Sequence, residues 1–132
     1  MRRARAVLNR GRRKAAARMI DVCDVGRPGA PVTDPVTGKV TRPLAPVYSG
    51  RCEFQQTLAQ ASTAASGEHE FSVQDIIWKT PVGAGPFEVD DVITVTTAAE
   101  DGQLLGRVYR VTELFHKTYA TAQRCRVEEV TG

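Results

Sequence analysis

Residues 92–112 read VITVTTAAEDGQLLGRVYRVT and carry the clearest structural signal in the chain. Every residue from 92 to 97 is valine, isoleucine or threonine, the residue types that favour strands. Residues 104–112 form a second run of this kind after a turn at 99–103, where Asp101-Gly102 is a strong hairpin signal. The stretch therefore predicts two antiparallel strands joined by a short turn.

Four further runs of strand composition lie outside this stretch, at residues 19–25, 47–55, 69–79 and 118–130. Turn residues separate the runs, and apolar residues alternate with polar ones inside them. In the last run, Tyr119, Cys125 and Val127 are expected to share one face. About six short strands at this spacing predict a mainly β fold, a small antiparallel β-barrel or sandwich.

Two long segments interrupt the strands. The first, residues 26–46, holds five prolines, and because proline cannot donate to a sheet ladder we expect an extended excursion at the sheet edge. Inside it, residues 34–40 have the composition of a tight turn, with Pro35 and Gly38 as its characteristic residues. The second, residues 56–68, is polar and rich in small side chains, which predicts a long inserted loop. Loops of this length inside a compact domain are often functional.

The N-terminal residues 1–18 hold eight of the 18 basic residues and none of the 15 acidic ones. These basic residues are Arg2, Arg3, Arg5, Arg10, Arg12, Arg13, Lys14 and Arg18. Alanine and arginine favour helices, and small apolar residues recur at helical spacing, which predicts a helix over 3–18 that Gly11 weakens in its middle. We therefore divide the chain into a basic helical arm at 1–18 and a β-barrel domain at 19–132.

The arm has three functional interpretations and one purely structural one, the solvated helix face. It could contact DNA or RNA phosphates, dock onto an acidic partner surface, or form a solvated helix face. A mitochondrial transit peptide is a weaker interpretation, because such peptides are usually rich in serine and residues 1–20 contain none.

The sequence contains none of the catalytic motifs considered and no apolar run of membrane-spanning length. At 132 residues, 42% hydrophobic and 25% charged, the chain has the size and composition of one soluble domain. No apolar run approaches the ~20 residues of a membrane-spanning helix, and no secretory signal is expected. Phosphate-binding, metalloprotease and serine-hydrolase motifs are missing, so we expect no enzyme, no metal and no cofactor.

The three cysteines, Cys23, Cys52 and Cys125, form no Cys-x-x-Cys pair, so they are expected to be reduced, buried thiols. The alternative is a nucleophilic pair of Cys23 or Cys125 with a histidine, for which only His69 and His116 are available.

Several stretches carry a resemblance, namely residues 34–38, 48–52, 86–95, 101–111 and 121–129. Together they resemble a family of small head–tail connector proteins from tailed phages of actinobacteria. The resemblance covers most of residues 18–129, and the basic arm is the part of the chain that corresponds least to the family pattern.

This resemblance implies a head-closure, or stopper, protein in the virion neck, assembled in the host cytoplasm without a membrane. Twelve or six copies would form a ring below the portal and adaptor rings and above the tail terminator, and would retain the packaged double-stranded DNA. The implied barrel has a loop that reaches the ring channel. In this chain the loop residues would be Gln56, Thr57, Gln60, Ser62, Thr63, Ser66, Gly67 and Glu68. The alternatives are a tail-completion or terminator-type neck protein, and a small nucleic-acid-binding module that uses the arm.

Overall fold

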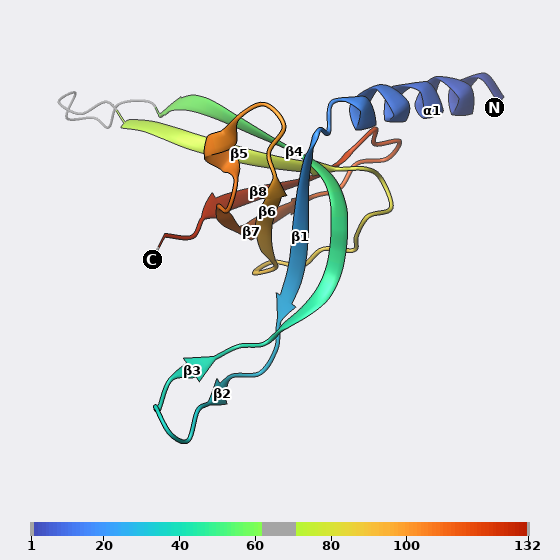
Figure 1. Cartoon of the computed structure of the whole chain (residues 1–132). Coiled ribbons are helices and arrows are strands. Elements are labelled where there is room, and N and C mark those ends of the chain that lie inside the picture. The colour runs from blue at the N-terminus through green and yellow to red at the C-terminus, as the bar shows by residue number, and fades with distance from the viewer. Residues whose placement is uncertain (1, 62–70, 132) are drawn as a thin grey trace.

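A computed structural model describes residues 2–61 and 71–131, of which 57–61 and 71–74 are described by their backbone alone. Its elements are α1 (Arg2–Ala17), β1 (Asp21–Pro28), β2 (Val32–Thr33), β3 (Val40–Thr41), β4 (Leu44–Ala61), β5 (Phe71–Thr80), β6 (Val92–Thr97), the 3-10 helix η1 (Gly102–Leu104), β7 (Val108–Phe115) and β8 (Gln123–Glu129). Strands β1-β4-β5-β8-β7-β6, in this order, close an antiparallel barrel, and β2 and β3 form a separate hairpin (Figure 1). The expected mainly β fold with an N-terminal helix is confirmed, and the barrel is the correct one of the two alternatives.

The barrel interior is filled by side chains that point inward from alternate strand positions. In β6 the buried residues are Ile93 and Val95, and in β7 they are Tyr109 and Val111. Trp78 of β5 is fully buried, and its ring lies 4.7 Å from that of Phe87. The alternation of apolar and polar residues in the sequence therefore indicates which face of each strand lies in the core.

All three cysteines belong to this core, and each is a free, buried thiol, as the sequence indicates. Burial and the charge of Asp91 raise the pKa of Cys125 to about 12. A hydrogen bond with Cys52, followed by burial, raises the pKa of Cys23 as well. These two thiols are therefore protonated at neutral pH, where only a thiolate would be an effective nucleophile.

Two predicted strand boundaries in the C-terminal half are wrong. Residues 104–107 are not in a strand, because the Asp101 carboxylate accepts a hydrogen bond from the Gln103 amide at 3.0 Å and starts η1. Gly106 then adopts a φ of 81°, which reverses the chain into β7. The last strand begins at Gln123 and not at residue 118, because Tyr119 has a φ of 58° and lies exposed outside the sheet.

The sequence analysis placed the start of the loop at 56–68 too early, because strand β4 continues to Ala61. Gln56, Thr57 and Gln60 belong to β4, whose backbone pairs with β5 from Glu53 opposite Lys79 to Ala61 opposite Phe71. A paired ladder satisfies backbone N–H and C=O groups whatever side chains it carries, so small polar residues did not end the strand. The other loop residues, Ser62, Thr63, Ser66, Gly67 and Glu68, lie outside the described residues.

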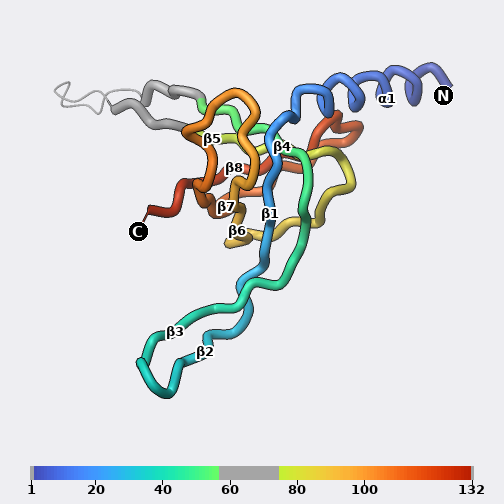
Figure 2. The backbone as a smooth tube through the Cα atoms, viewed as in Figure 1, coloured from blue at the N-terminus to red at the C-terminus, as the bar shows by residue number. Residues whose placement is uncertain are grey.

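The proline-rich excursion forms the end of β1, the projecting β2–β3 hairpin and the start of β4 (Figure 2). Its turn is confirmed, because Gly38 has a φ of 71° and its amide donates to the Asp34 carbonyl at 2.8 Å. The Asp34 carboxylate also accepts a hydrogen bond from the Val36 amide at 2.8 Å. Every residue from 30 to 46 is exposed, so the hairpin contributes nothing to the barrel core.

An ion pair between a half-buried arginine and a buried aspartate lies near the end of β1. Asp91 is fully buried and accepts hydrogen bonds from Arg27 of β1 through both carboxylate oxygens, at 3.0 and 3.1 Å. The amide of Glu88 donates to the same carboxylate at 2.8 Å. The backbone of Asp91 accepts from the Val111 amide of β7 at 2.9 Å. Asp91 therefore ties β1 to β7 and to the segment that precedes β6.

Candidate binding surface beside the N-terminal helix

Helix α1 lies outside the barrel, and none of its residues is buried (Figure 1). Its link to the barrel runs through the loop between β7 and β8. There the Arg12 Nε donates to the carbonyl of Ala120 at 3.1 Å. Gly11 faces Thr121 so closely that a β-carbon at Gly11 would lie 2.9 Å from the Thr121 methyl carbon. The helix thus docks at Gly11 and Arg12, and its first half projects beyond the barrel.

Gly11 therefore has a role that the sequence did not reveal. Glycine in a helix costs about 1 kcal/mol relative to alanine, so the sequence indicated a weak point. The structure shows instead that the absent side chain permits a close approach between α1 and Thr121 of the loop. The position that weakens the isolated helix is the one at which the barrel holds it.

We predict that Gly11→Ala detaches α1 from the barrel and exposes the basic arm to trypsin. The double variant Gly11→Ala/Thr121→Ala should restore docking, since the next-nearest atom to the new β-carbon, the Thr121 Cβ, lies at 3.9 Å. Alanine strengthens the helix itself, so faster cleavage cannot arise from helix weakening. Limited trypsin digestion followed by mass spectrometry measures this, and wild-type cleavage rates in the single variant would contradict the docking contact.

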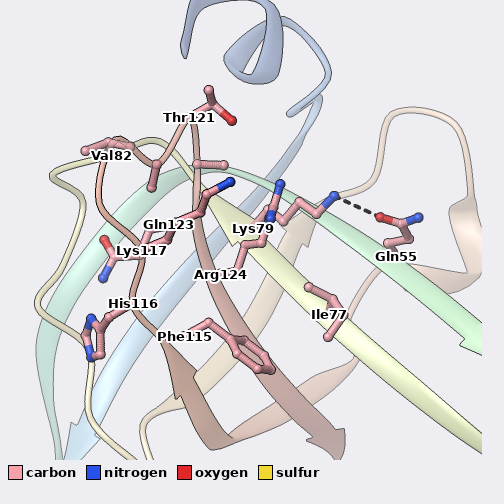
Figure 3. Close-up of a pocket in the computed structure, with 12 residues that line it drawn as sticks. Gln55, Ile77, Lys79, Val82, Phe115, His116, Lys117, Thr121, Gln123 and Arg124 are labelled. Atoms are coloured by element: carbon pink, nitrogen blue, oxygen red, sulfur yellow. Dashed lines mark hydrogen bonds between the residues drawn. The ribbon is translucent and has the colours of Figure 1, made fainter. Parts of the chain in front are cut away.

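A pocket of about 740 Å³ opens beside this docking point (Figure 3). It is lined by Gln55 of β4, Ile77 and Lys79 of β5, Val82, Phe115 of β7, His116, Lys117, Ala120, Thr121 and Ala122 of the following loop, and Gln123 and Arg124 of β8. Its interior is apolar, whereas Lys79, Lys117 and Arg124 add positive charge. No acidic residue belongs to this lining. The volume is within the usual range for a ligand pocket.

Most of the charge at this pocket is not neutralised within the protein. Lys79 donates to the side-chain oxygen of Gln55 at 2.8 Å, which leaves its charge intact (Figure 3). Lys117 and Arg124 form no ion pair with any residue that the structure describes. Arg126, two residues along β8, differs because it pairs with Glu113 at 3.0 Å and with Asp75 at 3.8 Å. Along β8, the cation without an ion pair is therefore Arg124, the one next to the loop at which α1 docks.

The arm residues extend this basic surface. Arg2, Arg3, Arg5, Arg10, Arg13, Lys14 and Arg18 are exposed, Arg12 is half-buried, and none of them pairs with an acid in the described part of the chain. We use the term basic face for these eight residues together with Lys79, Lys117 and Arg124. Sequence reasoning found the arm but missed the other three, which come from two strands and a loop. For Lys117 and Arg124 the available signal was the acid-free stretch 114–127, whereas Lys79 has no such signal.

The structure does not bring together a cysteine nucleophile and its base. Cys125 is buried in the barrel, whereas His116 is exposed at the pocket rim, and His69 lies outside the described residues. Residues 2–61 and 71–131 contain no cluster of three or more histidine, cysteine or acidic residues arranged to hold a metal ion. The basic face can bind anionic groups, and its pocket can also bury an apolar group.

We predict that the buried thiols make the protein less stable in alkali. The pKa of Cys125 is about 12 in the folded chain and near 9.0 when the thiol is unperturbed, so the unfolded chain loses its proton first. The contribution of the protonated Cys125 thiol to the free energy of unfolding is complete below pH 9. It is lost as the pH rises toward 12, by up to about 1.4 kcal/mol per pH unit. Urea titrations at pH 7, 9 and 10 measure this, and Cys125→Ala should flatten the decline. An unchanged decline in that variant would contradict the assignment.

The family of unknown function DUF6093 matches residues 11–128 of this chain. The chain belongs to this family. The DUF6093 match includes the barrel except for the last residue of β8, and it also includes the β2–β3 hairpin and the docking residues Gly11 and Arg12. It also includes all three of the pocket cations, Lys79, Lys117 and Arg124. No curated protein and no solved structure matches the chain. Within the described residues, no helix is both long and apolar enough to cross a membrane.

Proposed function

We propose that this protein is a structural subunit of a phage virion neck, a head-closure or stopper ring that joins the portal and adaptor rings to the tail. The observation that carries the proposal is the shape of the fold. A small closed barrel bears three segments that project from it (Figure 1). These are α1, the β2–β3 hairpin and the extension of β4 and β5. The resemblance to actinobacteriophage connector proteins supports the same function.

The β2–β3 hairpin has the surface of an assembly arm. Val32, Val36 and Val40 are 54%, 90% and 59% exposed, and isolated two-stranded hairpins are marginal in water. Val32 and Val40 lie on opposite faces of the hairpin, because Val32 pairs with Thr41 and Val40 pairs with Thr33. Each face of this projecting segment therefore presents an exposed apolar side chain, which favours a protein–protein contact. In the proposed ring, this hairpin packs against a neighbouring subunit, which buries the valines.

The β4–β5 hairpin extends beyond the part of the barrel to which β8 pairs. Strand β8 pairs with β5 only from Ile76 to Thr80, whereas β4 pairs with β5 back to Phe71. Gln56, Thr57 and Gln60 belong to this extension. In the proposed ring, the hairpin is directed toward the channel, where it retains packaged DNA.

We predict that removing the β2–β3 hairpin abolishes assembly without unfolding the barrel. Residues 30–42 can be replaced by two glycines, because the amide of Gly29 already donates to the carbonyl of Pro43 at 2.8 Å across the base of the hairpin. No residue from 30 to 42 is buried, so the melting temperature should change by no more than a few degrees. Native mass spectrometry measures assembly, and intact rings in this variant would show that the hairpin is not an assembly arm.

The function itself is tested in the virion. Electron microscopy of purified necks, with the protein labelled, should show a ring between the portal–adaptor complex and the tail terminator. Filled heads assembled with a variant shortened to a tight turn between residues 57 and 74 should lose their DNA, whereas heads with the unmodified protein keep it. A label at the tail side of the terminator would indicate a tail-completion protein, and absence from particles would overturn the proposal.

The second candidate is a nucleic-acid-binding module, which the unpaired cations of the basic face favour. Binding of duplex DNA by the purified protein would then weaken steeply with salt, with a slope set by the number of phosphates contacted. Weak binding at low salt would exclude this candidate. Head closure is preferred because the hairpin and the β4–β5 extension have no evident use in a monomeric DNA-binding protein.

A further inference from the structure

We propose that the pocket of the basic face binds the acidic turn 99–105 of a second copy of this chain. The inference rests on the proposed ring and names the contact between its subunits. The pocket and the turn are different surfaces, so the contact is head-to-tail. Head-to-tail contacts of one kind generate rings when the rotation between copies closes.

The chemistry of the pocket defines what it can bind. Lys117 and Arg124 supply positive charge that no described residue neutralises. Ile77, Phe115 and Val82 supply an apolar surface between them, and Phe115 is 39% exposed. A fitting occupant therefore has a carboxylate close to an aliphatic side chain. A phosphodiester backbone satisfies the charges but leaves the apolar interior uncovered, so a protein segment fits better than DNA.

The turn before β7 presents this combination. Glu100 is exposed and forms no hydrogen bond or ion pair with the described residues, and Leu105 is 58% exposed. The turn is preformed by η1, since Asp101 caps it and the amide of Gly106 donates to the Val95 carbonyl at 3.0 Å. A preformed segment loses little conformational entropy when it binds.

The position of the turn allows both surfaces to work at once. Its first residues lie at the start of β1, where the amide of Ala99 donates to the Asp21 carboxylate at 3.1 Å. In Figure 1 the turn, with η1, lies on one side of the start of β1 and α1 projects on the other. One copy can therefore present its turn to one neighbour while its pocket receives the turn of another.

Charge complementarity also acts over the whole chain. All acidic residues lie after residue 18, so the basic face of one copy meets a barrel of opposite net charge on the next. Such complementarity orients the subunits and speeds their association. The contact should weaken as salt concentration rises, because the charges that form it are exposed.

The test uses charge reversal in the full-length protein. Lys117→Glu/Arg124→Glu and Glu100→Lys/Leu105→Lys should each weaken self-association by about tenfold or more, measured by sedimentation equilibrium. Mixing the two variants should restore association, since each supplies the surface that the other lacks. Arg51→Glu is the matched control, because Arg51 is exposed on β4 and does not line the pocket. Carbodiimide, which joins touching carboxylates and amines, should link Glu100 of one copy to Lys117 of another.

The outcomes separate this contact from the proposed function. Wild-type association in both reversal variants, with no Glu100–Lys117 link, would overturn the contact and leave the ring intact. A wild-type protein that stays monomeric at every concentration and is missing from necks would overturn both. Unchanged association together with lost DNA binding in the pocket variant would also overturn the contact, and would identify the pocket as a nucleic-acid site.

Discussion

Asp91→Ala will destabilise the folded protein by about 2–3 kcal/mol, because it removes a fully buried carboxylate whose hydrogen bonds to charged and backbone donors are of the stronger kind. The substitution removes the acceptor of two Arg27 hydrogen bonds, at 3.0 and 3.1 Å, and of the Glu88 amide at 2.8 Å. Urea denaturation at pH 7, followed by circular dichroism, measures the loss. The free energy of unfolding should fall because the urea concentration at the midpoint falls. The slope of this free energy against urea concentration should stay unchanged.

Two further variants separate the ion pair from simple packing. Arg27→Met leaves the buried carboxylate without its cation, so it should also destabilise the protein, whereas Arg27→Met/Asp91→Asn removes both charges and should recover part of the loss. Asp90→Asn is the matched control, since Asp90 is exposed and its ion pair with Arg110, at 3.5 Å, is a surface pair. A loss as large in Asp90→Asn as in Asp91→Ala would contradict the stabilising role of the buried Asp91 carboxylate.

The second large effect is expected at Trp78, where substitution by alanine should cost about 3–5 kcal/mol. Trp78 is fully buried, its ring lies 4.7 Å from that of Phe87, and in the sheet register it pairs with Phe54 and Cys125. Removal of the Trp78 side chain leaves a cavity in the core. The cavity cannot close, because β5 is held in place by hydrogen bonds to β4 on one side and β8 on the other. Chemical denaturation followed by circular dichroism measures this, because the variant has no tryptophan fluorescence.

Trp78→Phe keeps most of the ring volume and should cost less than half as much as Trp78→Ala. Tyr119→Asn provides the exposed aromatic control, since Tyr119 is 71% exposed and asparagine tolerates its φ of 58°. This variant should unfold within about 0.5 kcal/mol of wild type. Equal stability of Trp78→Ala and Tyr119→Asn would mean that Trp78 is not the centre of the core.

Most errors of the sequence analysis occur where contacts between distant segments overrode local composition. The turn at Asp101-Gly102 does join antiparallel β6 and β7, but a local cap by the Asp101 side chain forms η1 and lengthens the connection to residues 98–107. The polar composition after residue 55 predicted a loop, yet pairing with β5 continued the strand to Ala61. Gly11 was interpreted as a weak point of the helix, because its neighbour Thr121 lies more than a hundred residues away.

The same distinction applies to the binding surface. Eight arm cations are adjacent in sequence and were found without a structure, whereas Lys79, Lys117 and Arg124 come together only through the pairing of β5 with β8 and the loop before β8. Asp91 and Arg27 are 64 residues apart, and their pairing could not be inferred from either local sequence.

By itself the amino-acid sequence determined the mainly β class, the N-terminal helix, the turn at 34–38 and the burial of the cysteines, because each depends on the period or composition of a short segment. The tertiary structure alone decided that the strands close into a barrel, which cations share a pocket, and where α1 docks. Those features depend on strand order and register, which arise from packing between distant segments and have no local signature.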